Sequence, residues 1–259
     1  MRLKLTLNCR PNSTLSLNYQ YALQAVIYKV LERADPVFSS WLHEHGYEGT
    51  GEKKFKLFTF SPLEGYPYFI DKHKQSIIFR GDTVIWQVSF YVDEGMEKFI
   101  SGLFQNQIFD VVTPAGRIQF TVQSVEMLAP PNFSTTMRFR ATSPICIAEK
   151  DENHKHKQYR TPNDVNYDNL FFGNIKDKYK SVNKNSTNDA PTPTLKILSE
   201  PRMKGLTLYK KEAAETTKTI GYTFDFEITA PETWLRAGYD AGFGSNNPIG
   251  FGFCEVLKE

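Results

Sequence analysis

Cysteines and long apolar stretches are both scarce in this chain of 259 residues. The three cysteines, Cys9, Cys146 and Cys254, are odd in number, far apart and without the spacing of a metal site. No run of about 18 apolar residues is present, so we expect neither a membrane span nor a membrane partner. The first residues alternate apolar and polar side chains, which indicates a half-buried strand rather than a signal peptide. A reducing cytoplasm is the simplest location that fits these absences.

An excess of charge of one sign is also missing. The chain has 31 Lys and Arg residues against 29 Asp and Glu residues, which gives a formal net charge of +2. This balance excludes a uniformly basic surface, so a nucleic-acid site would need positive charge that is clustered locally. The hydrophobic content of 40 % and the aromatic content of 14 % support sizeable cores, in one large domain or in two ordinary ones.

The common glycine motifs for nucleotide binding are absent, although glycine is concentrated near the C-terminus. Gly242, Gly244, Gly250 and Gly252 form two Gly-Phe-Gly units that five residues separate. The third glycine of a dinucleotide motif would fall at Asn247, and no Gly-Lys-Ser/Thr follows as in a P-loop. A nucleotide-binding enzyme is therefore disfavoured. Clustered glycines still indicate exposed backbone N–H groups that face a ligand, while composition alone favours a hairpin with stacked aromatic rings.

The pattern of the first half predicts the order β-α-β-β-α-β, with a short second helix added after the first. Leu23, Val26 and Val30 belong to the apolar stripe of the first helix. Gly46 ends the short helix, and Asp93 is the expected N-cap of the last one. The expected elements are a strand through residues 3–7, helices over 17–33 and 37–45, strands over 54–60, 69–79 and 83–92, a helix after 93, and a strand over 117–128.

Residues 129–132 interrupt the chain with two prolines, and the same order of elements then begins again. The expected elements of the second half are a strand over 137–141, a helix over 163–180, a flexible loop over 183–193, a hairpin of strands over 194–198 and 205–210, a long strand over 220–228, a short helix from 231, and a final strand. We therefore predict an α+β protein of two ferredoxin-like domains, residues 1–129 and 133–259, with the glycine-rich loop in the second.

Two parts of the sequence resemble one known family. The double Gly-Phe-Gly pattern is similar to the glycine-rich loop of the RAMP superfamily of CRISPR-associated proteins. The segments YQYALQ, IY, LHE and KLFTFS, at residues 19–24, 27–28, 42–44 and 56–61, resemble the N-terminal half of its repeat-processing endoribonucleases. The resemblance implies a pair of ferredoxin-like folds, the cutting of precursor CRISPR RNA, and a basic cleft between the two halves where the RNA lies.

The resemblance also implies three catalytic residues: a histidine in the second short helix, a tyrosine in the first helix, and a lysine at the start of the next strand. These positions correspond to His43, Tyr28 and Lys56. Each has another interpretation, since Tyr28 borders an apolar stripe and Lys56 shares one strand face with Lys54. His45 stays an alternative to His43, because two positions on a helix point about 200° apart and only one enters a given site.

The reaction that the resemblance implies suits these residue types. RNA carries its own nucleophile, the 2′-hydroxyl, so its cleavage needs no metal when the protein supplies an acid and a base. An imidazole, with a pKa near about 6.5, exchanges a proton at neutral pH, and a lysine ammonium stabilises charge on the pentavalent phosphorane. We expect a 2′,3′-cyclic phosphate and a 5′-hydroxyl as products, with no metal and no cofactor.

Further positions are predicted to contact RNA. They comprise the glycines and the polar centre of the loop, two arginines on one strand face, and basic residues of the stretch 149–160. The set is Gly242, Gly244, Ser245, Asn246, Asn247, Gly250, Gly252, Arg138, Arg140, Lys155, Lys157 and Arg160. The expected partner is CRISPR repeat RNA, and subunits of a CRISPR effector complex and a second copy of the chain are further expected partners. The alternative function is a non-cleaving RAMP scaffold that binds RNA within an effector complex.

Overall fold

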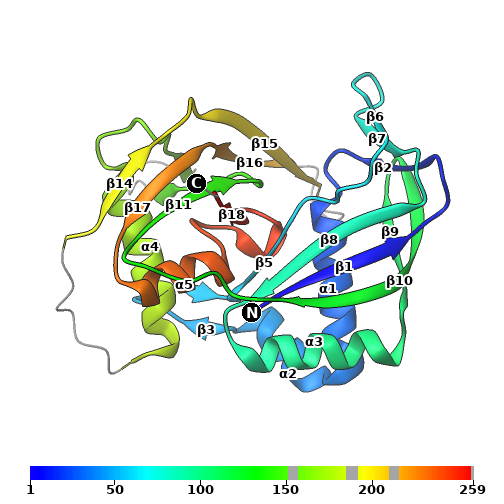
Figure 1. The fold of residues 1–259 in the computed structure, drawn as a ribbon, viewed down its shortest axis with the longest axis horizontal. Helices are drawn as coiled ribbons and strands as arrows, with labels where there is room; N and C mark the ends of the chain where they lie inside the picture. The colour runs from blue at the N-terminus through cyan, green and yellow to red at the C-terminus, as the bar shows by residue number, and fades with distance from the viewer. Residues whose placement is uncertain (151–156, 185–191, 210–215, 258–259) are drawn as a thin grey trace.

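Two sheets, each with helices packed on it, lie side by side in the computed structural model, which describes residues 1–150, 157–184, 192–209 and 216–257 (Figure 1). We call the residues up to the end of β10 the N-terminal half and those from the start of β11 the C-terminal half. Among the described residues, no helix combines the length and the apolar character that a membrane crossing requires.

The N-terminal half contains a five-stranded antiparallel sheet in the order β5-β8-β1-β10-β9. Its central strand buries Leu3, Leu5 and Leu7, and Leu5 lies opposite Trp86 and Val125 of the two neighbouring strands. The strands are β1 (Arg2–Asn8), β5 (Phe58–Phe60), β8 (Thr83–Phe90), β9 (Ile108–Thr113) and β10 (Gly116–Leu128). Four of them form the ferredoxin-like core, and β9 is an added edge strand.

Three helices cover one face of this sheet: α1 (Gln20–Ala34), α2 (Pro36–Glu44) and α3 (Asp93–Gln105) (Figure 1). The Asp35 side chain accepts a hydrogen bond from the Phe38 N–H at 2.9 Å, which caps α2 at its start. Gly46 follows α2 with a φ of +70°, as its predicted helix-ending role requires. The third helix differs from the prediction by one residue, because Val92 is its N-cap and Asp93 lies in its first turn.

The C-terminal half repeats the arrangement with a four-stranded sheet in the order β14-β17-β11-β18. Its elements are β11 (Thr136–Ala141), α4 (Tyr167–Val182), β14 (Thr194–Ile197), β17 (Asp225–Thr229), α5 (Glu232–Ala241), the 3-10 helix η1 (Asn247–Ile249) and β18 (Cys254–Val256). Each half thus follows the order β-α-β-β-α-β around its own sheet. The predicted tandem ferredoxin-like fold is confirmed.

Small sheets are attached to both halves. One has three strands in the order β2-β7-β6, and three others are two-stranded. Their strands are β2 (Ser13–Ser16), β6 (Tyr68–Asp71) and β7 (Ser76–Phe79), then the pairs β3 (Tyr47–Glu48) with β4 (Lys54–Phe55), β12 (Ala148–Lys150) with β13 (Lys157–Tyr159), and β15 (Arg202–Tyr209) with β16 (Thr216–Thr223).

Several strand predictions are wrong in detail. Residues 54–60 form two strands rather than one, because Leu57 has a φ of +53° and turns the chain between β4 and β5. Residues 220–228 divide into the end of β16 and β17, and residues 69–79 form the β6–β7 hairpin. The expected hairpin of 194–198 with 205–210 is absent, since β14 pairs with β17 and β15 with β16. Apolar alternation marks extended segments but does not specify their partners.

Buried polar contacts join the two halves. Arg2, only 3 % exposed, donates to the Tyr239 carbonyl oxygen at 2.6 Å. Its guanidinium lies 3.4 Å from the centre of the Tyr239 ring and 4.1 Å from that of Phe253, which are cation–π distances. Thr59 of β5 donates from its hydroxyl to the Phe251 carbonyl oxygen at 3.0 Å. These contacts hold the glycine-rich loop directly against the sheet of the N-terminal half.

Candidate functional site

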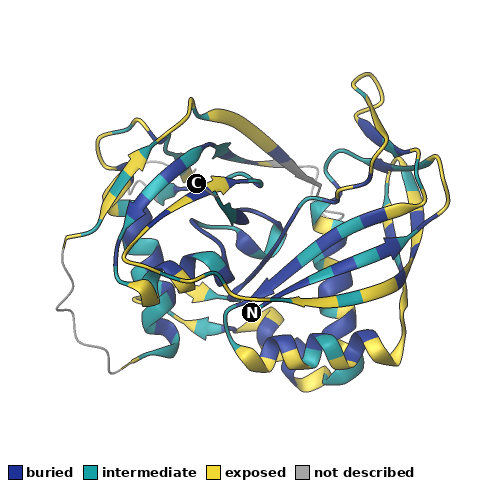
Figure 2. Ribbon diagram, viewed as in Figure 1, coloured by how far each residue is buried: buried dark blue, intermediate teal, exposed yellow. Residues whose placement is uncertain are grey.

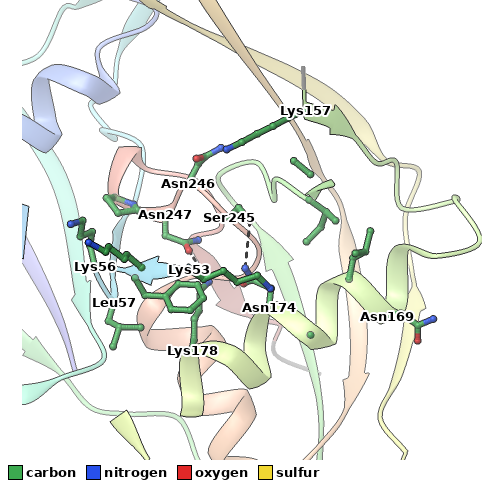
Figure 3. Close-up of a pocket in the computed structure, with 17 residues that line it drawn as sticks. Lys53, Lys56, Leu57, Lys157, Asn169, Asn174, Lys178, Ser245, Asn246 and Asn247 are labelled. Carbon is green, nitrogen blue, oxygen red and sulfur yellow. Dashed lines mark hydrogen bonds between the residues drawn. The ribbon is translucent and has the colours of Figure 1, made fainter. Parts of the chain in front are cut away.

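A cleft of about 480 Å³ opens between the two halves (Figure 3). Residues 53–57 line it from the N-terminal half, and α4 and residues 245–248 line it from the C-terminal half. Four lysines belong to its lining at or near the surface: Lys53, Lys54, Lys56 and Lys157. We call it the lysine cleft. The local clustering of positive charge that a nucleic-acid site requires is therefore present in a chain of small net charge.

Ion pairing neutralises only part of this charge. The Lys53 ammonium lies 2.6 Å from a carboxylate oxygen of Asp177 and so also links the two halves. Within the described part of the chain, Lys54, Lys56 and Lys157 have no carboxylate within ion-pair distance. Lys157 extends toward Asn246 across the mouth of the cleft (Figure 3). The lysine cleft thus keeps a positive potential that favours a polyanion.

The three residues with predicted catalytic roles come together at the edge of this cleft. The ring centres of Tyr28, on α1, and His43, on α2, are 4.9 Å apart and meet edge to face. Lys56, in the turn between β4 and β5, donates from Nζ to the His43 carbonyl oxygen at 2.7 Å. Three separate elements therefore converge on one place, and a strained turn at Leu57 directs the lysine there.

Burial changes the acid–base behaviour of two of these groups. It raises the pKa of the Tyr28 phenol well above its ordinary value, so the hydroxyl stays protonated and can donate a hydrogen bond at neutral pH. Burial, and then repulsion from Lys54, lowers the pKa of the Lys56 ammonium. Lys56 therefore loses its charge at a lower pH than an ordinary lysine does. His43 itself is exposed to solvent, which leaves its ring accessible to a substrate.

His45 is differently placed from His43. It follows the last residue of α2 as the C-cap, and its backbone N–H donates to the Trp41 carbonyl oxygen at 2.8 Å. Of the two imidazoles, His43 alone makes a ring contact with Tyr28 among the described residues. The geometry therefore places His43, rather than His45, in contact with Tyr28.

The glycine-rich loop, residues 242–252, is folded inward. Gly242, Gly244, Gly250 and Gly252 are buried and have φ values between +70° and +90°. The backbone N–H groups of residues 243, 245, 250 and 252 donate to carbonyl oxygens of the protein itself, at 2.7–2.9 Å. The expectation of exposed N–H groups that face a ligand is wrong for these four, because internal acceptors use them. Only the polar centre, with Ser245 and Asn246 half-buried, lines the cleft.

A buried lysine organises this loop. Lys178 of α4 is 1 % exposed, and its ammonium donates to the carbonyl oxygens of Gly242 (2.5 Å) and Gly244 (2.6 Å) and to Asn247 Oδ1 (2.7 Å) (Figure 3). The Asn247 side-chain amide donates in turn to the Phe243 and Phe251 carbonyl oxygens, at 3.1 and 3.0 Å. Asn247 therefore lines the cleft as a buried residue whose side chain is engaged by the loop itself.

Sequence reasoning missed Lys178 completely. Phe171, Ile175 and Lys178 have the 4- and 3-residue spacing of a buried helical stripe, and all three are buried. A lysine in such a stripe is a usable signal, since buried lysines are almost always paired or hydrogen-bonded. Burial lowers the pKa of Lys178 to about 7.

The other predicted RNA contacts lie outside the lysine cleft or outside the described residues. Arg138 and Arg140 project from the exposed face of β11, as predicted, and pair there with Glu227 at 2.7 Å and Asp225 at 2.8 Å. Arg160 pairs with a carboxylate of the nearby β12 strand at 2.7 Å. Lys155 lies outside the described residues. Of the described members of the basic set predicted around 150–160, Lys157 lines the cleft and Arg160 does not.

Metal ligands are not gathered anywhere in the described ranges. No group of three or more His, Cys, Asp or Glu side chains lies together there in a way that could hold a metal ion. The three cysteines are all buried and unpaired.

Two ferredoxin-like halves joined around a glycine-rich loop define a protein of the RAMP class. The chain belongs to the Cas6 family of CRISPR-associated proteins: the model of the Cas6 N-terminal region matches residues 14–126, and the model of the Cas6 C-terminal region matches residues 128–256. Together the two matches span nearly the whole chain.

Relatives and a solved structure agree with this assignment. The chain is 26 % identical to the CRISPR-associated endoribonuclease Cas6 1 of Methanocaldococcus jannaschii, over 100 % of this chain and 94 % of the relative. It is 25 % identical to the CRISPR-associated endoribonuclease Cas6 of Pyrococcus furiosus, over 92 % of this chain and 82 % of the relative. A solved structure described as a RAMP protein binding different RNA substrates has the same fold, with a TM-score of 0.81, 18 % identity and full coverage of both chains.

The positive φ of the loop glycines leads to a first prediction. A Cβ at Gly244, where φ is +70°, would lie 2.6 Å from the Cys146 carbonyl oxygen, whereas a Cβ at Gly173, inside α4, meets nothing within 4 Å. Gly244→Ala should therefore lower the free energy of unfolding by about 1–4 kcal/mol through strain and crowding. Gly173→Ala should raise it by about 0.5–1 kcal/mol, because alanine is the better helix former. Urea unfolding of wild type and both variants checks this. A Gly244→Ala variant as stable as wild type would contradict the role assigned to the loop backbone.

The buried ammonium leads to a second prediction. The pKa of Lys178 is lowered by burial to about 7 in the folded chain, while an unfolded lysine keeps its proton to about pH 10.4. Between these two pH values the unfolded chain binds one more proton than the folded chain. The contribution of Lys178 to the free energy of unfolding should therefore increase as the pH rises. Urea unfolding at pH 6 to 10 should show wild type gaining stability relative to Lys178→Met. If the difference in free energy of unfolding between wild type and Lys178→Met stays constant with pH, the buried ammonium keeps its proton over this range.

Proposed function

We propose that this protein binds CRISPR repeat RNA in the lysine cleft and cleaves it by attack of the RNA's own 2′-hydroxyl, without a metal ion. The observation that carries the proposal is the convergence of Tyr28, His43 and Lys56 from three elements at the edge of a lysine-lined cleft. The products would be a 2′,3′-cyclic phosphate and a 5′-hydroxyl.

Each member of the group has a role that suits its chemistry. His43 exchanges the proton of the attacking 2′-hydroxyl or of the leaving 5′-oxygen, as an imidazole does near neutral pH. Lys56 stabilises the added negative charge of the phosphorane. Burial keeps the phenol of Tyr28 protonated. Tyr28 packs against the imidazole and donates a hydrogen bond to a phosphate oxygen or to the leaving group.

The relatives support a cleaving enzyme over a scaffold. The proteins from Methanocaldococcus jannaschii and Pyrococcus furiosus are both named CRISPR-associated endoribonucleases, and they align with nearly the whole chain. A non-cleaving RAMP scaffold would need the fold and the lysine cleft but not a histidine, a tyrosine and a lysine in contact. The contacts expected with effector-complex subunits and with a second copy of the chain stay predictions, and so does a location in the cytoplasm.

The roles of the two neighbouring histidines generate the next prediction. Loss of the proton-transfer group should slow the chemical step by about 10²–10⁴-fold. His43→Ala should therefore bind repeat RNA with nearly unchanged affinity and cleave it at least about 100-fold more slowly. His45→Ala is the matched control and should keep most of the activity. Single-turnover kinetics with enzyme in excess measure the chemical step apart from product release.

Other results with these two histidine variants would change the proposal in specific ways. Loss of activity in His45→Ala alone would move the site to the end of α2. Full activity in both variants would remove histidine from the mechanism. Repeat RNA that wild type binds but leaves intact would favour the scaffold function instead.

The identity of the nucleophile is tested with the substrate. A repeat RNA with one deoxynucleotide immediately 5′ of the scissile phosphate lacks the attacking hydroxyl, so cleavage should stop while affinity changes little. The unmodified repeat should be cut equally well in excess EDTA. A product that ends in a 3′-hydroxyl, or activity that EDTA abolishes and magnesium restores, would indicate attack by a metal-activated water.

A further inference from the structure

The hairpin formed by β6 and β7 presents a group of exposed apolar side chains at the opposite end of the N-terminal half from α2 (Figure 1). Tyr66 is 89 % exposed, Tyr68 53 %, Phe69 47 % and Ile70 41 %. The strand β6 is the edge of the small sheet β2-β7-β6, and the hairpin projects from the body of the N-terminal half (Figure 1). Three of the four residues of β6 are exposed, whereas the strands of the main sheet alternate buried residues with more exposed ones (Figure 2). Such clustered exposure on a globular protein usually marks a binding surface.

The base of the hairpin is firmly anchored, so the exposure does not result from a loose segment. The strand β7 buries Ile77 and Phe79 while it pairs with β2 on its other side. The turn is also ordered, because Asp71 accepts hydrogen bonds from the backbone N–H groups of His73 and Lys74, each at 3.0 Å. A rigid platform is the result, and a rigid platform loses little conformational entropy when a ligand binds.

Cationic groups surround the aromatic side chains. Lys72 and Lys74 are exposed in the turn, and neither forms an ion pair with the described residues. The Asp71 carboxylate, the acid closest to them in sequence, is engaged by the turn. Arg80 lies over the Phe69 ring, with its guanidinium carbon 5.6 Å from the ring centre. Planar rings and cations thus lie near one another on the hairpin, with Tyr68 and Phe69 on opposite faces of β6 and Arg80 on the side of Phe69.

We propose that this hairpin is a stacking platform for a single-stranded stretch of RNA that continues beyond the lysine cleft. Unpaired bases stack on aromatic side chains and guanidinium planes, while lysines contact the phosphates. The inference rests on the proposed function, because a precursor RNA extends on both sides of the place where it is cut. The platform therefore holds the part of the substrate that flanks the repeat rather than the scissile site.

The same exposed strand edge could pair with another protein chain, so the chemistry of the surroundings decides between the two partners. An edge strand that recruits a protein presents apolar residues with complementary apolar surface around them. Here the surroundings are the cationic Lys72, Lys74 and Arg80, and a cation already stacks on Phe69. This combination of aromatic faces and positive charge favours single-stranded nucleic acid.

Binding measurements with two uncleavable RNAs test the platform. One is the bare repeat with a deoxynucleotide at the cleavage site, and the other adds unstructured flanks of about ten nucleotides on both sides. Wild type should bind the flanked RNA more tightly than the bare repeat. The double variant Tyr68→Ala/Phe69→Ala should bind the flanked RNA about 5- to 150-fold more weakly, which is the usual loss for one stacked base, and the bare repeat equally well. Phe104→Ala is the control, because Phe104 is 65 % exposed on α3, away from the hairpin.

Salt dependence and cross-linking add two independent readouts. Lys72→Ala/Lys74→Ala should reduce the slope of log affinity against log salt by about 1.4 for the flanked RNA, since each phosphate contact with a single strand adds about 0.7. Flanks that carry 5-iodouracil should cross-link to a peptide containing Tyr66, Tyr68 or Phe69. Cleavage of the unmodified, all-ribose repeat by the same preparations measures the proposed function separately.

Three outcomes would overturn the platform while cleavage of the unmodified repeat remains intact. One is an equal affinity of wild type for both RNAs. Another is a loss of affinity for the flanked RNA in Phe104→Ala that equals the loss in Tyr68→Ala/Phe69→Ala. The last is an association of wild type with itself that Tyr68→Ala/Phe69→Ala abolishes without any change in RNA affinity, which would make the hairpin a contact between copies of the chain.

Discussion

One buried ammonium determines the shape of the loop on which the cleft depends. Lys178 supplies its three N–H donors to three oxygens of the glycine-rich loop, and Asn247 links two further carbonyls to the same cluster. A buried carbonyl without a donor costs about 1–3 kcal/mol, and a buried cation without acceptors costs more. Loop and lysine therefore satisfy each other. The charged form donates all three hydrogen bonds but buries a charge, and this burial lowers the pKa of Lys178 to about 7.

The positive φ values of the glycines follow from the same constraint. A loop whose carbonyl oxygens converge on one ammonium must turn repeatedly, and glycine tolerates the required left-handed conformations. The inward turn also brings Gly250 against Phe60 and the Phe251 carbonyl against Thr59 of β5. Ser245 and Asn246 are then left at the surface of the cleft. The internal structure of the C-terminal half thus determines one wall of a site whose other wall belongs to the N-terminal half.

Local sequence patterns predicted the elements well and their three-dimensional partners less well. The apolar stripes located α1 and α3, and Pro36 and Gly46 bounded α2. The family resemblance selected Tyr28, His43 and Lys56, which lie together in the structure, although Lys56 is in a turn and not at the start of a strand. Their catalytic roles stay predictions. The glycine pattern identified the loop but suggested that its N–H groups face outward, because spacing does not reveal where a backbone group points. Lys178 was invisible for a related reason: a lone lysine in a helix normally projects into solvent, and only its neighbours 64 to 69 residues away make its burial favourable.

The break between β4 and β5 explains how a lysine from a strand region reaches the histidine. Leu57 has a φ of +53°, which is unfavourable for a residue with a side chain, yet it is held by its burial and by the Tyr91 N–H, which donates to its carbonyl oxygen at 2.9 Å. Had residues 54–60 continued as one strand, Lys56 would have stayed on a strand face beside Lys54. The turn instead directs its ammonium to the His43 carbonyl. Thr59, two residues after Leu57, donates to the Phe251 carbonyl oxygen, so one short segment positions both Lys56 and the glycine-rich loop. The contact of Lys56 with His43 and the contact of Thr59 with the C-terminal half are therefore only three residues of chain apart.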